Sequence, residues 1–363
     1  MTRRIIASGE PVKILYENEQ LPIFQNRMYD SEQEAISCPK GDIRLVENLK
    51  TGLVYNEAFR PELMQYDDHY QNEQAVSPLF RAHLETVMQT IAKTMGRQSI
   101  VEVGCGKGFF LEMLLADGFD AQGFDPTYEG CSSRVTKEYF SPTLGIQADG
   151  LVLRHVLEHI QDPVSFLMQL KDANGGKGKI YIEVPCFDWI CNQHAWFDIF
   201  YEHVNYFRLS DFHRMFDVVY ESGRLFGDQY LYVIAELSSL KQPMVDENKR
   251  VRFPNDFMNN LTEKNSSELD GEAAVWGGAS KGVIFALLKK RCGQPVKLVI
   301  DINPAKQGKF LPATGLRVFS PKEALSKLPD GSTIYVMNSN YMEEIKQMSG
   351  NAYHYIGVDC ESV

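Results

Sequence analysis

The stretch from residue 100 to residue 108, IVEVGCGKG, joins a short apolar run to a glycine-rich turn, and the helical run FFLEMLLADG follows it. Glycines let the backbone turn tightly and approach a ligand, while the N-terminus of the helix offers N–H groups that have no partner within the helix. The next apolar run, AQGFD, ends on Asp125, which lies 21 residues after Gly104. Because parallel strands end at one edge of a sheet, we expect the turn and this carboxylate to lie together and to bind a ligand that carries a ribose.

The same alternation of short apolar runs and helical runs continues along the chain. LVLRHV and IYIEV extend the central pattern, and AAVWG, GASKG, VIFALLKKR, KLVID and TIYVMN repeat its plan near the C-terminus. This is the pattern of parallel sheets covered by helices, so the sequence predicts an α/β protein with two Rossmann-like domains. We expect four segments: 1–80 as an N-terminal arm or small substrate-covering domain, 81–240 as the central domain, 241–270 as a linker or exposed helix, and 271–363 as the C-terminal domain.

Composition and charge narrow the class of protein. The formal net charge of −11 at pH 7 disfavours nucleic acid as a partner, because the average surface repels phosphate backbones. No apolar run approaches the roughly 20 residues that cross a bilayer, and the N-terminal stretch MTRRIIASGEPVKILYENEQ carries polar residues where a signal peptide is apolar. The seven cysteines are scattered and form no C-x-x-C pair, so we expect reduced thiols, no metal and a soluble protein of the cytoplasm.

A turn of this kind serves NAD as well as S-adenosylmethionine, and the detailed sequence separates the two. The acid inside the first strand, the G-x-G-x-G form and the segment LEHIQDP at 157–163 together resemble the class I S-adenosylmethionine-dependent methyltransferases. The resemblance implies S-adenosylmethionine as the cofactor, with the glycines along its methionine portion and a carboxylate on its ribose. The cofactor-binding residues would be Glu102, Gly104, Cys105, Gly106, Gly108, Asp125, Arg154 and His155.

A narrower resemblance extends over most of the chain. The segments GFDPTYEG, RHVLEHI, EVPCFDWI, FYEHVNYF, WGGASKG and DINPAKQGKF look like those of the C-methyltransferases that act on nucleotide-linked ketosugars. The zinc-binding cysteines that this family carries near its N-terminus are absent here. The resemblance implies a nucleotide-sugar as the substrate, bound by the arm and by the C-terminal domain. The substrate-binding residues would be Tyr66, Tyr70, Lys281, Lys309, Asn338 and Asn340.

Methylation of carbon requires a base that removes an acidic C–H proton beside a carbonyl group, and a group that holds the enolate oxygen. The resemblance implies that His203 is the base and that Glu202 orients it or contacts the sugar, with Tyr201 beside them. The alternative interpretation is an aromatic packing segment, because Phe197, Ile199, Phe200, Tyr206 and Phe207 surround these three residues in the sequence.

Three other interpretations stay open at this point. His155, Glu158 and His159 fit the H-x-x-E-H pattern of zinc peptidases, but the pattern directly follows a strand of the cofactor domain and lacks a third ligand. The enzyme could also methylate oxygen or nitrogen of a related carbohydrate, for which His203 would matter less. Finally, a protein that binds nucleotide-sugars without catalysis could keep the same fold, since fold does not fix function.

Overall fold

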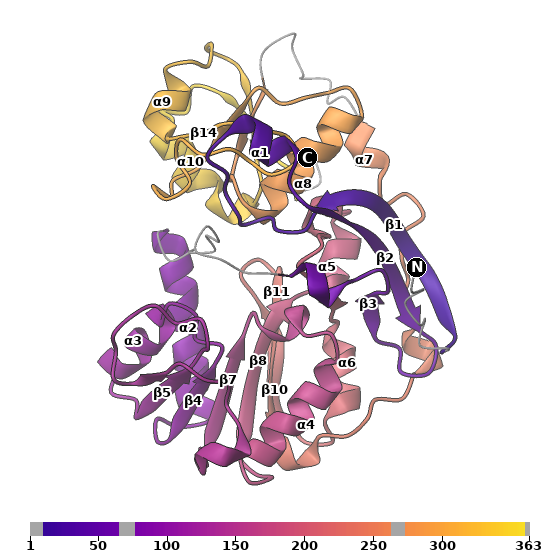
Figure 1. Ribbon diagram of the computed structural model, residues 1–363, viewed down its shortest axis with the longest axis vertical. Coiled ribbons are helices and arrows are strands. Elements are labelled where there is room, and N and C mark those ends of the chain that lie inside the picture. Colours follow the sequence, from indigo (N-terminus) through magenta and orange to yellow (C-terminus); the bar gives the residue numbers. More distant parts are fainter. Residues whose placement is uncertain (1–9, 65–76, 263–272, 360–363) are drawn as a thin grey trace.

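The computed structural model describes residues 10–64, 77–262 and 273–359. These residues form three sheets; in Figure 1 the C-terminal sheet lies at the top, the central sheet at the bottom and the N-terminal sheet at the right. The N-terminal sheet is antiparallel, the central sheet is mostly parallel and the C-terminal sheet is parallel throughout. The predicted α/β class with two Rossmann-like domains is therefore confirmed.

The N-terminal sheet has four strands in the order β1-β2-β3-β9. Its last strand comes from a distant part of the chain, since β9 lies between the helices of the central domain in the sequence. The short helix α1 reaches from this unit to the C-terminal domain, where Ala313 donates a backbone hydrogen bond to Ala35 at 2.8 Å. The elements are β1 (Val12–Pro22), α1 (Glu32–Ile36), β2 (Lys40–Asn48), β3 (Val54–Asn56) and β9 (Asn205–Tyr206).

The central sheet has seven strands in the order β10-β11-β8-β7-β4-β5-β6. Strand β4 lies between β5 and β7, so the chain reverses its direction of winding there, and this is where open α/β sheets bind ligands. Strands β11 and β10 run antiparallel at one edge. The strands are β4 (Ile100–Val103), β5 (Ala121–Phe124), β6 (Val135–Thr136), β7 (Gly150–Arg154), β8 (Lys179–Pro185), β10 (Val219–Leu225) and β11 (Tyr230–Glu236).

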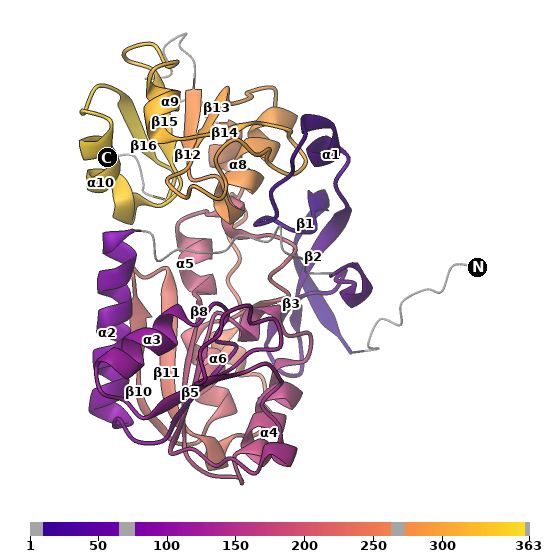
Figure 2. The same cartoon turned by 60° about the vertical axis from the view of Figure 1, so that its left-hand side comes forward.

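Alternation of side chains along these strands fixes which helices cover which face. Val152 and Tyr181 pack with α2 and α3, whereas Leu151 and Ile182 pack with α4 on the opposite face. In Figure 2, α2 and α3 lie toward the left of the central domain and α4 lies at its lower right. The helices are α2 (Pro78–Thr94), α3 (Phe109–Ala116), α4 (Pro163–Ala173), α5 (Phe187–Asn192) and α6 (Leu209–Met215).

The C-terminal domain is a five-stranded parallel sheet in the order β14-β13-β12-β15-β16. The ring of Phe285 on α8 stacks on Trp196 of the central domain with centroids 5.5 Å apart, and Lys281 forms an ion pair with Asp198 at 3.1 Å. These contacts fix the two domains together. The elements are β12 (Ala273–Trp276), α8 (Ser280–Arg291), β13 (Leu298–Ile300), β14 (Val318–Phe319), α9 (Pro321–Leu325), β15 (Thr333–Val336), α10 (Met342–Met348) and β16 (His354–Gly357).

The segment before the C-terminal domain, predicted as a linker or exposed helix, follows the N-terminal sheet. Val251 and Phe257 are buried there, and the backbone of Val251 donates to Glu47 of β2 at 3.1 Å. Its one α-helix among the described residues is the short α7 (Asn259–Thr262). Within the described part of the chain, no helix has the length and apolar character needed to cross a bilayer.

Candidate functional site

The predicted glycine turn lies at the carboxyl end of β4 and leads into α3. Gly104, Gly106 and Gly108 have φ values of 75°, 54° and 81°, which favour glycine over residues with a side chain. A Cβ atom on Gly104 would lie 2.5 Å from Cγ2 of Val156, so this residue also lets the segment after β7 approach the turn. The structure therefore places the turn directly against residues 154–159.

Asp125 follows β5 and is joined to the turn, as the sequence predicts. Its Oδ2 accepts the Gly106 N–H at 2.8 Å, and its Oδ1 accepts the N–H and the hydroxyl of Thr127 at 2.8 and 2.7 Å. Three of the roughly four acceptor sites of the carboxylate are therefore used, and Oδ2 keeps one for a hydroxyl group of a ribose. Cys105 is buried in this turn, and burial raises the pKa of its thiol to about 12, so the thiol is neutral.

Glu102 points into the interior beneath the turn. Its side chain is buried, and Oε2 has no hydrogen-bond partner in the part of the chain that the structure describes. Burial and the nearby charge of Asp125 raise the pKa of Glu102 to about 8, although Arg154 opposes this shift. The acid is therefore neutral at pH 7 before a ligand binds.

Arg154 and His155, at the end of β7, are both tied to the buried carboxylate of Glu183. The Arg154 guanidinium lies 3.2 Å from this carboxylate, and Nε2 of His155 lies 3.1 Å from it. Nδ1 of His155 lies 3.4 Å from Glu158. Burial disfavours the charged imidazole, but the two carboxylates raise the pKa of His155 to about 9. The imidazolium therefore balances two buried acids beside the turn.

His203 lies on the loop before β9 and faces the same segment. Its ring centroid is 5.0 Å from that of His159 and 4.0 Å from that of Phe200. The loop is closed by the Tyr206 hydroxyl, which accepts the Phe200 N–H and donates to the Phe200 carbonyl, both at 3.1 Å. Burial, together with the nearby His159, His155 and Lys281, holds the pKa of His203 well below its usual value. The imidazole is neutral and able to accept a proton.

Glu202 and Tyr201 turn the other way, toward the N-terminal unit. Oε1 of Glu202 accepts the backbone N–H groups of Gln25 and Asn26, and the Tyr201 hydroxyl accepts the Arg60 N–H at 2.8 Å. These contacts anchor the N-terminal unit to the loop that carries His203. Of the three residues in this motif, His203 therefore faces residues 154–159, whereas Glu202 and Tyr201 contact the N-terminal unit.

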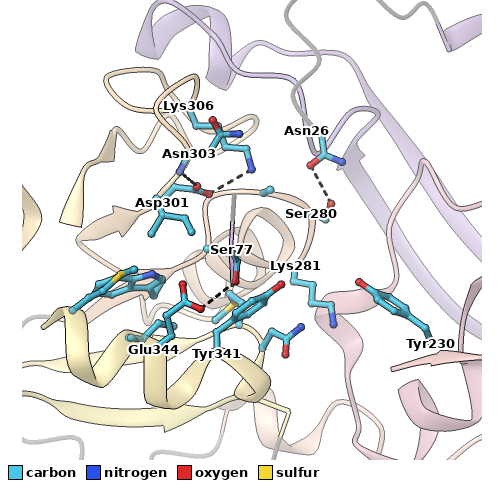
Figure 3. A pocket seen from close by; sticks show the side chains of 18 residues that line it. Asn26, Ser77, Tyr230, Ser280, Lys281, Asp301, Asn303, Lys306, Tyr341 and Glu344 are labelled. Carbon is cyan, nitrogen blue, oxygen red and sulfur yellow. Dashed lines mark hydrogen bonds and ion pairs between the residues drawn. The ribbon is translucent and has the colours of Figure 1, made fainter. Parts of the chain in front are cut away.

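The second glycine turn, after β12, has the same construction as the first. Asp301 follows β13, and its carboxylate accepts the backbone N–H groups of Gly278 and Asn303, both at 2.8 Å. Lys306 lies 3.5 Å from this carboxylate, and both side chains are buried. Figure 3 shows the pocket above this turn. Its walls come from all three domains, because Asn26, Ser77 and Tyr230 line it together with residues of the C-terminal domain.

The predicted substrate-binding residues do not all reach this pocket. Lys281 and Asn338 line it, whereas Lys309 pairs with Asp30 at the surface and Asn340 donates to the Phe226 carbonyl at 2.9 Å. Tyr66 and Tyr70 lie outside the described residues.

Sequence reasoning missed several pocket residues. Asn303, Lys306 and Tyr341 face the pocket and were not expected there. The signal for two of them was the polar run DINPAK directly after the β13 strand.

The H-x-x-E-H pattern does not form a helical pair of histidines. Leu157–His159 is a 3₁₀ turn, and His155 is bonded to carboxylates on both ring nitrogens. His159 instead lies against His203, with ring centroids 5.0 Å apart, and no sequence pattern indicates this contact. Nδ1 of His159 lies 2.8 Å from the backbone oxygen of Glu202, so it must carry the proton.

Comparisons with known proteins cover both α/β domains. A search of curated proteins gave no significant match. Among solved structures, a SAM-dependent methyltransferase from Archaeoglobus fulgidus is similar at 18% identity over 42% of this chain and 94% of that chain, with a TM-score of 0.33. One from Mesorhizobium loti shows 12% identity over 44% and 99% of the two chains, with a TM-score of 0.34. Magnesium protoporphyrin IX methyltransferase from Synechocystis, solved with bound SAH, shows 13% identity over 44% and 82%, with a TM-score of 0.34.

Two family profiles match the chain itself. Residues 66–218 match a methyltransferase domain, and residues 248–357 match a C-methyltransferase C-terminal domain. The first match contains the glycine turn with Asp125, and the second contains the turn with Asp301. The chain therefore contains a class I S-adenosylmethionine-dependent methyltransferase domain, followed by the C-terminal domain of C-methyltransferases.

Proposed function

We propose that this enzyme transfers the methyl group to a carbon atom of a nucleotide-linked ketosugar, and that His203 removes the proton from that carbon. The observation that carries the proposal is the place of His203 relative to the cofactor turn. Gly104 of the turn packs against Val156, and three residues further along His159 faces the His203 ring at 5.0 Å. A base at this place is close to where a bound cofactor would present its methyl group.

The proposed reaction begins with the neutral, buried imidazole of His203. An acidic C–H bond beside the ketone breaks, its electron pair enters the enolate, and the proton goes to a ring nitrogen of His203. S-adenosylmethionine, when bound, supplies an electrophilic methyl group for the enolate carbon. The aromatic wall around His203, with Phe200 at 4.0 Å and Tyr206 at 6.3 Å between ring centroids, excludes water that would reprotonate the enolate.

The pocket of the C-terminal domain supports a nucleotide as the other half of the substrate. Trp276 and Tyr341 offer flat apolar surfaces for a base, and Lys306 offers a positive charge for phosphate. The pocket borders the cofactor side of the molecule, because Tyr230 lines it and also packs edge-on against His155 with ring centroids 4.6 Å apart. A nucleotide held here can therefore extend its sugar toward residues 155–159.

The direct test is a panel of nucleotide-linked ketosugars incubated with the full chain and methyl-labelled S-adenosylmethionine. We expect a product whose mass rises by one methyl group, with the label bonded to carbon in the NMR spectrum. A label on oxygen or nitrogen would instead establish the alternative methyltransferase. Binding of both ligands without turnover on any member of the panel would favour a binding protein.

The proposed base is tested by His203→Asn, which keeps a polar side chain of similar size. We expect turnover to fall by about 10² to 10⁴, the usual range for one general base, with little change in binding of either ligand. The variant should also lose exchange of the substrate C–H proton with deuterated solvent, followed by NMR without cofactor. His194→Asn is the matched control, because His194 pairs with Asp256 at the surface. Full turnover or persistent exchange in His203→Asn would move the base elsewhere.

A further inference from the structure

Three side chains that can bind a metal ion meet at the segment behind the cofactor turn. Glu158, His159 and His203 each offer one ligand atom, and these atoms lie within 4.8 Å of one another. Two of the residues belong to the 3₁₀ turn Leu157–His159, and His203 comes from a loop more than 40 residues later. The backbone joins the two segments, since the Val204 N–H donates to the Glu158 carbonyl at 2.8 Å. The three ligand atoms are therefore held in place by the fold.

The buried carboxylate of Glu158 indicates that a cation can bind here. Its side chain is 1% exposed. One oxygen, Oε1, lies 3.4 Å from Nδ1 of His155, but Oε2 has no hydrogen-bond partner among the described residues. A buried carboxylate oxygen without a donor is costly, because that oxygen has lost its hydrogen bonds to water and none replaces them. A metal ion at the cluster would supply the missing partner.

His159 is already oriented as metal-binding histidines usually are. Its Nδ1–H donates to the backbone carbonyl of Glu202 at 2.8 Å, which leaves Nε2 with its lone pair for a ligand. In metal sites this second hydrogen bond fixes the tautomer and the ring orientation. Two histidines and one glutamate form an established ligand set for Zn²⁺, with a fourth position left for water or substrate.

We propose that Glu158, His159 and His203 form a site for a divalent transition-metal ion such as Zn²⁺, and that metal bound there inhibits the enzyme. Inhibition, which rests on the proposed function, follows because the metal–nitrogen bond uses the His203 lone pair that would otherwise accept the substrate proton. No oxidation or bond cleavage is involved. Nitrogen-rich sites favour Zn²⁺, Co²⁺ and Ni²⁺ over Mg²⁺, which prefers oxygen ligands and retains its water.

The site is tested by titrating the full chain, free of substrate and cofactor, with Co²⁺, because four- and five-coordinate Co²⁺ absorbs visible light. We expect one equivalent to bind, with no thiolate band, and Zn²⁺ to displace it. Glu158→Gln and His159→Asn should each weaken Co²⁺ binding at least tenfold, by analogy with the loss seen when even an outer partner of a metal site is removed. His194→Asn, which alters a surface histidine beside a carboxylate, should leave binding unchanged.

The Co²⁺ titration of the wild-type chain can refute the inference even if the variants fail to fold. Absence of the visible Co²⁺ spectrum, or the same spectrum in folded His159→Asn, would refute the site. Loss of methyl transfer on addition of one equivalent of Zn²⁺, restored by a chelator, supports inhibition, whereas a rise in activity would refute it. Metal binding is measured without substrate, so a failure of the proposed substrate or base leaves that result intact. Conversely, failure to bind Co²⁺ leaves the proposed methylation untouched.

Discussion

Replacing Asp125 by alanine tests whether the tethered carboxylate holds the ribose of S-adenosylmethionine. The side chain is 9% exposed and accepts hydrogen bonds from Gly106 and Thr127, so its two oxygens are fixed at the edge of the sheet. The substitution removes the acceptor site on Oδ2 that a ribose could use. It also frees the Gly106 N–H, which would then depend on water.

The expected loss follows from the kind of hydrogen bond involved. A hydrogen bond to a charged group contributes about 1.5 to 3 kcal/mol. The bond between Asp125 and Gly106 is absent from the variant both with and without ligand, so its loss does not change the affinity. We therefore expect the affinity for S-adenosylmethionine to fall by about 1.5 to 3 kcal/mol, which corresponds to roughly 10- to 150-fold in Kd. Most of this loss comes from the missing hydrogen bond between residue 125 and the ribose.

Thr127→Val is the matched control for the tether. Its hydroxyl donates to Asp125 at 2.7 Å and the residue is exposed, so the substitution loosens the carboxylate without removing it. In Thr127→Val the loss of affinity for S-adenosylmethionine should stay below about 1 kcal/mol, the usual net contribution of one neutral donor. Titration calorimetry measures the affinity of both variants, and a circular dichroism spectrum like that of the wild type shows that each is folded. Unchanged affinity in folded Asp125→Ala would exclude Asp125 from the cofactor site, and an equal loss in both variants would assign the effect to the turn.

Three further predictions concern stability and metal. Burial raises the pKa of Glu102 from 4.5 to about 8, so the folded protein holds a proton that the unfolded chain releases, and the free energy of unfolding should fall as the pH rises between these values. Glu102→Gln should flatten this part of the pH profile in urea titrations, and an unchanged profile would contradict a neutral acid. Gly282→Ala would bring Cβ to 1.8 Å from the Gly277 carbonyl oxygen, so we expect a loss of about 1 to 3 kcal/mol in urea unfolding, and wild-type stability would contradict this close approach. Chelation should lower neither the melting temperature nor the activity, and a loss of either would mean that bound metal supports the protein.

Parts of the fold were predictable because their signals are local. The apolar run of β4, the glycine turn and the run that ends on Asp125 lie within 26 residues, and each is a pattern of neighbours in the sequence. The N-terminal sheet has no such signal. In β1 the buried and exposed residues do not alternate, and the sheet is completed by the two-residue strand β9 from the central domain. Pairing of this kind depends on the tertiary structure, so only an arm or a small domain could be expected there.

The site divides in the same way. The glycine turn and Asp125 were predicted to lie together, because strand ends in a parallel sheet meet at one edge, and the structure joins them through the Gly106 N–H. The motif around His203 was harder, since consecutive side chains on an irregular loop point in different directions. Glu202 therefore reaches the backbone at residues 25 and 26, while His203 reaches His159. Nothing in the sequence spacing of His159 and His203 indicates their contact.

The two glycine turns suggest how cofactor and substrate could be brought together. In both Rossmann-like domains an aspartate after the second strand accepts a turn N–H at 2.8 Å, from Gly106 in one and from Gly278 in the other. Tyr230 stands between them, since it lines the C-terminal pocket and packs on His155. His155 is in turn paired with Glu158, the neighbour of His159. A series of side-chain contacts through Tyr230, His155 and Glu158 therefore runs from the second pocket to the segment that faces His203.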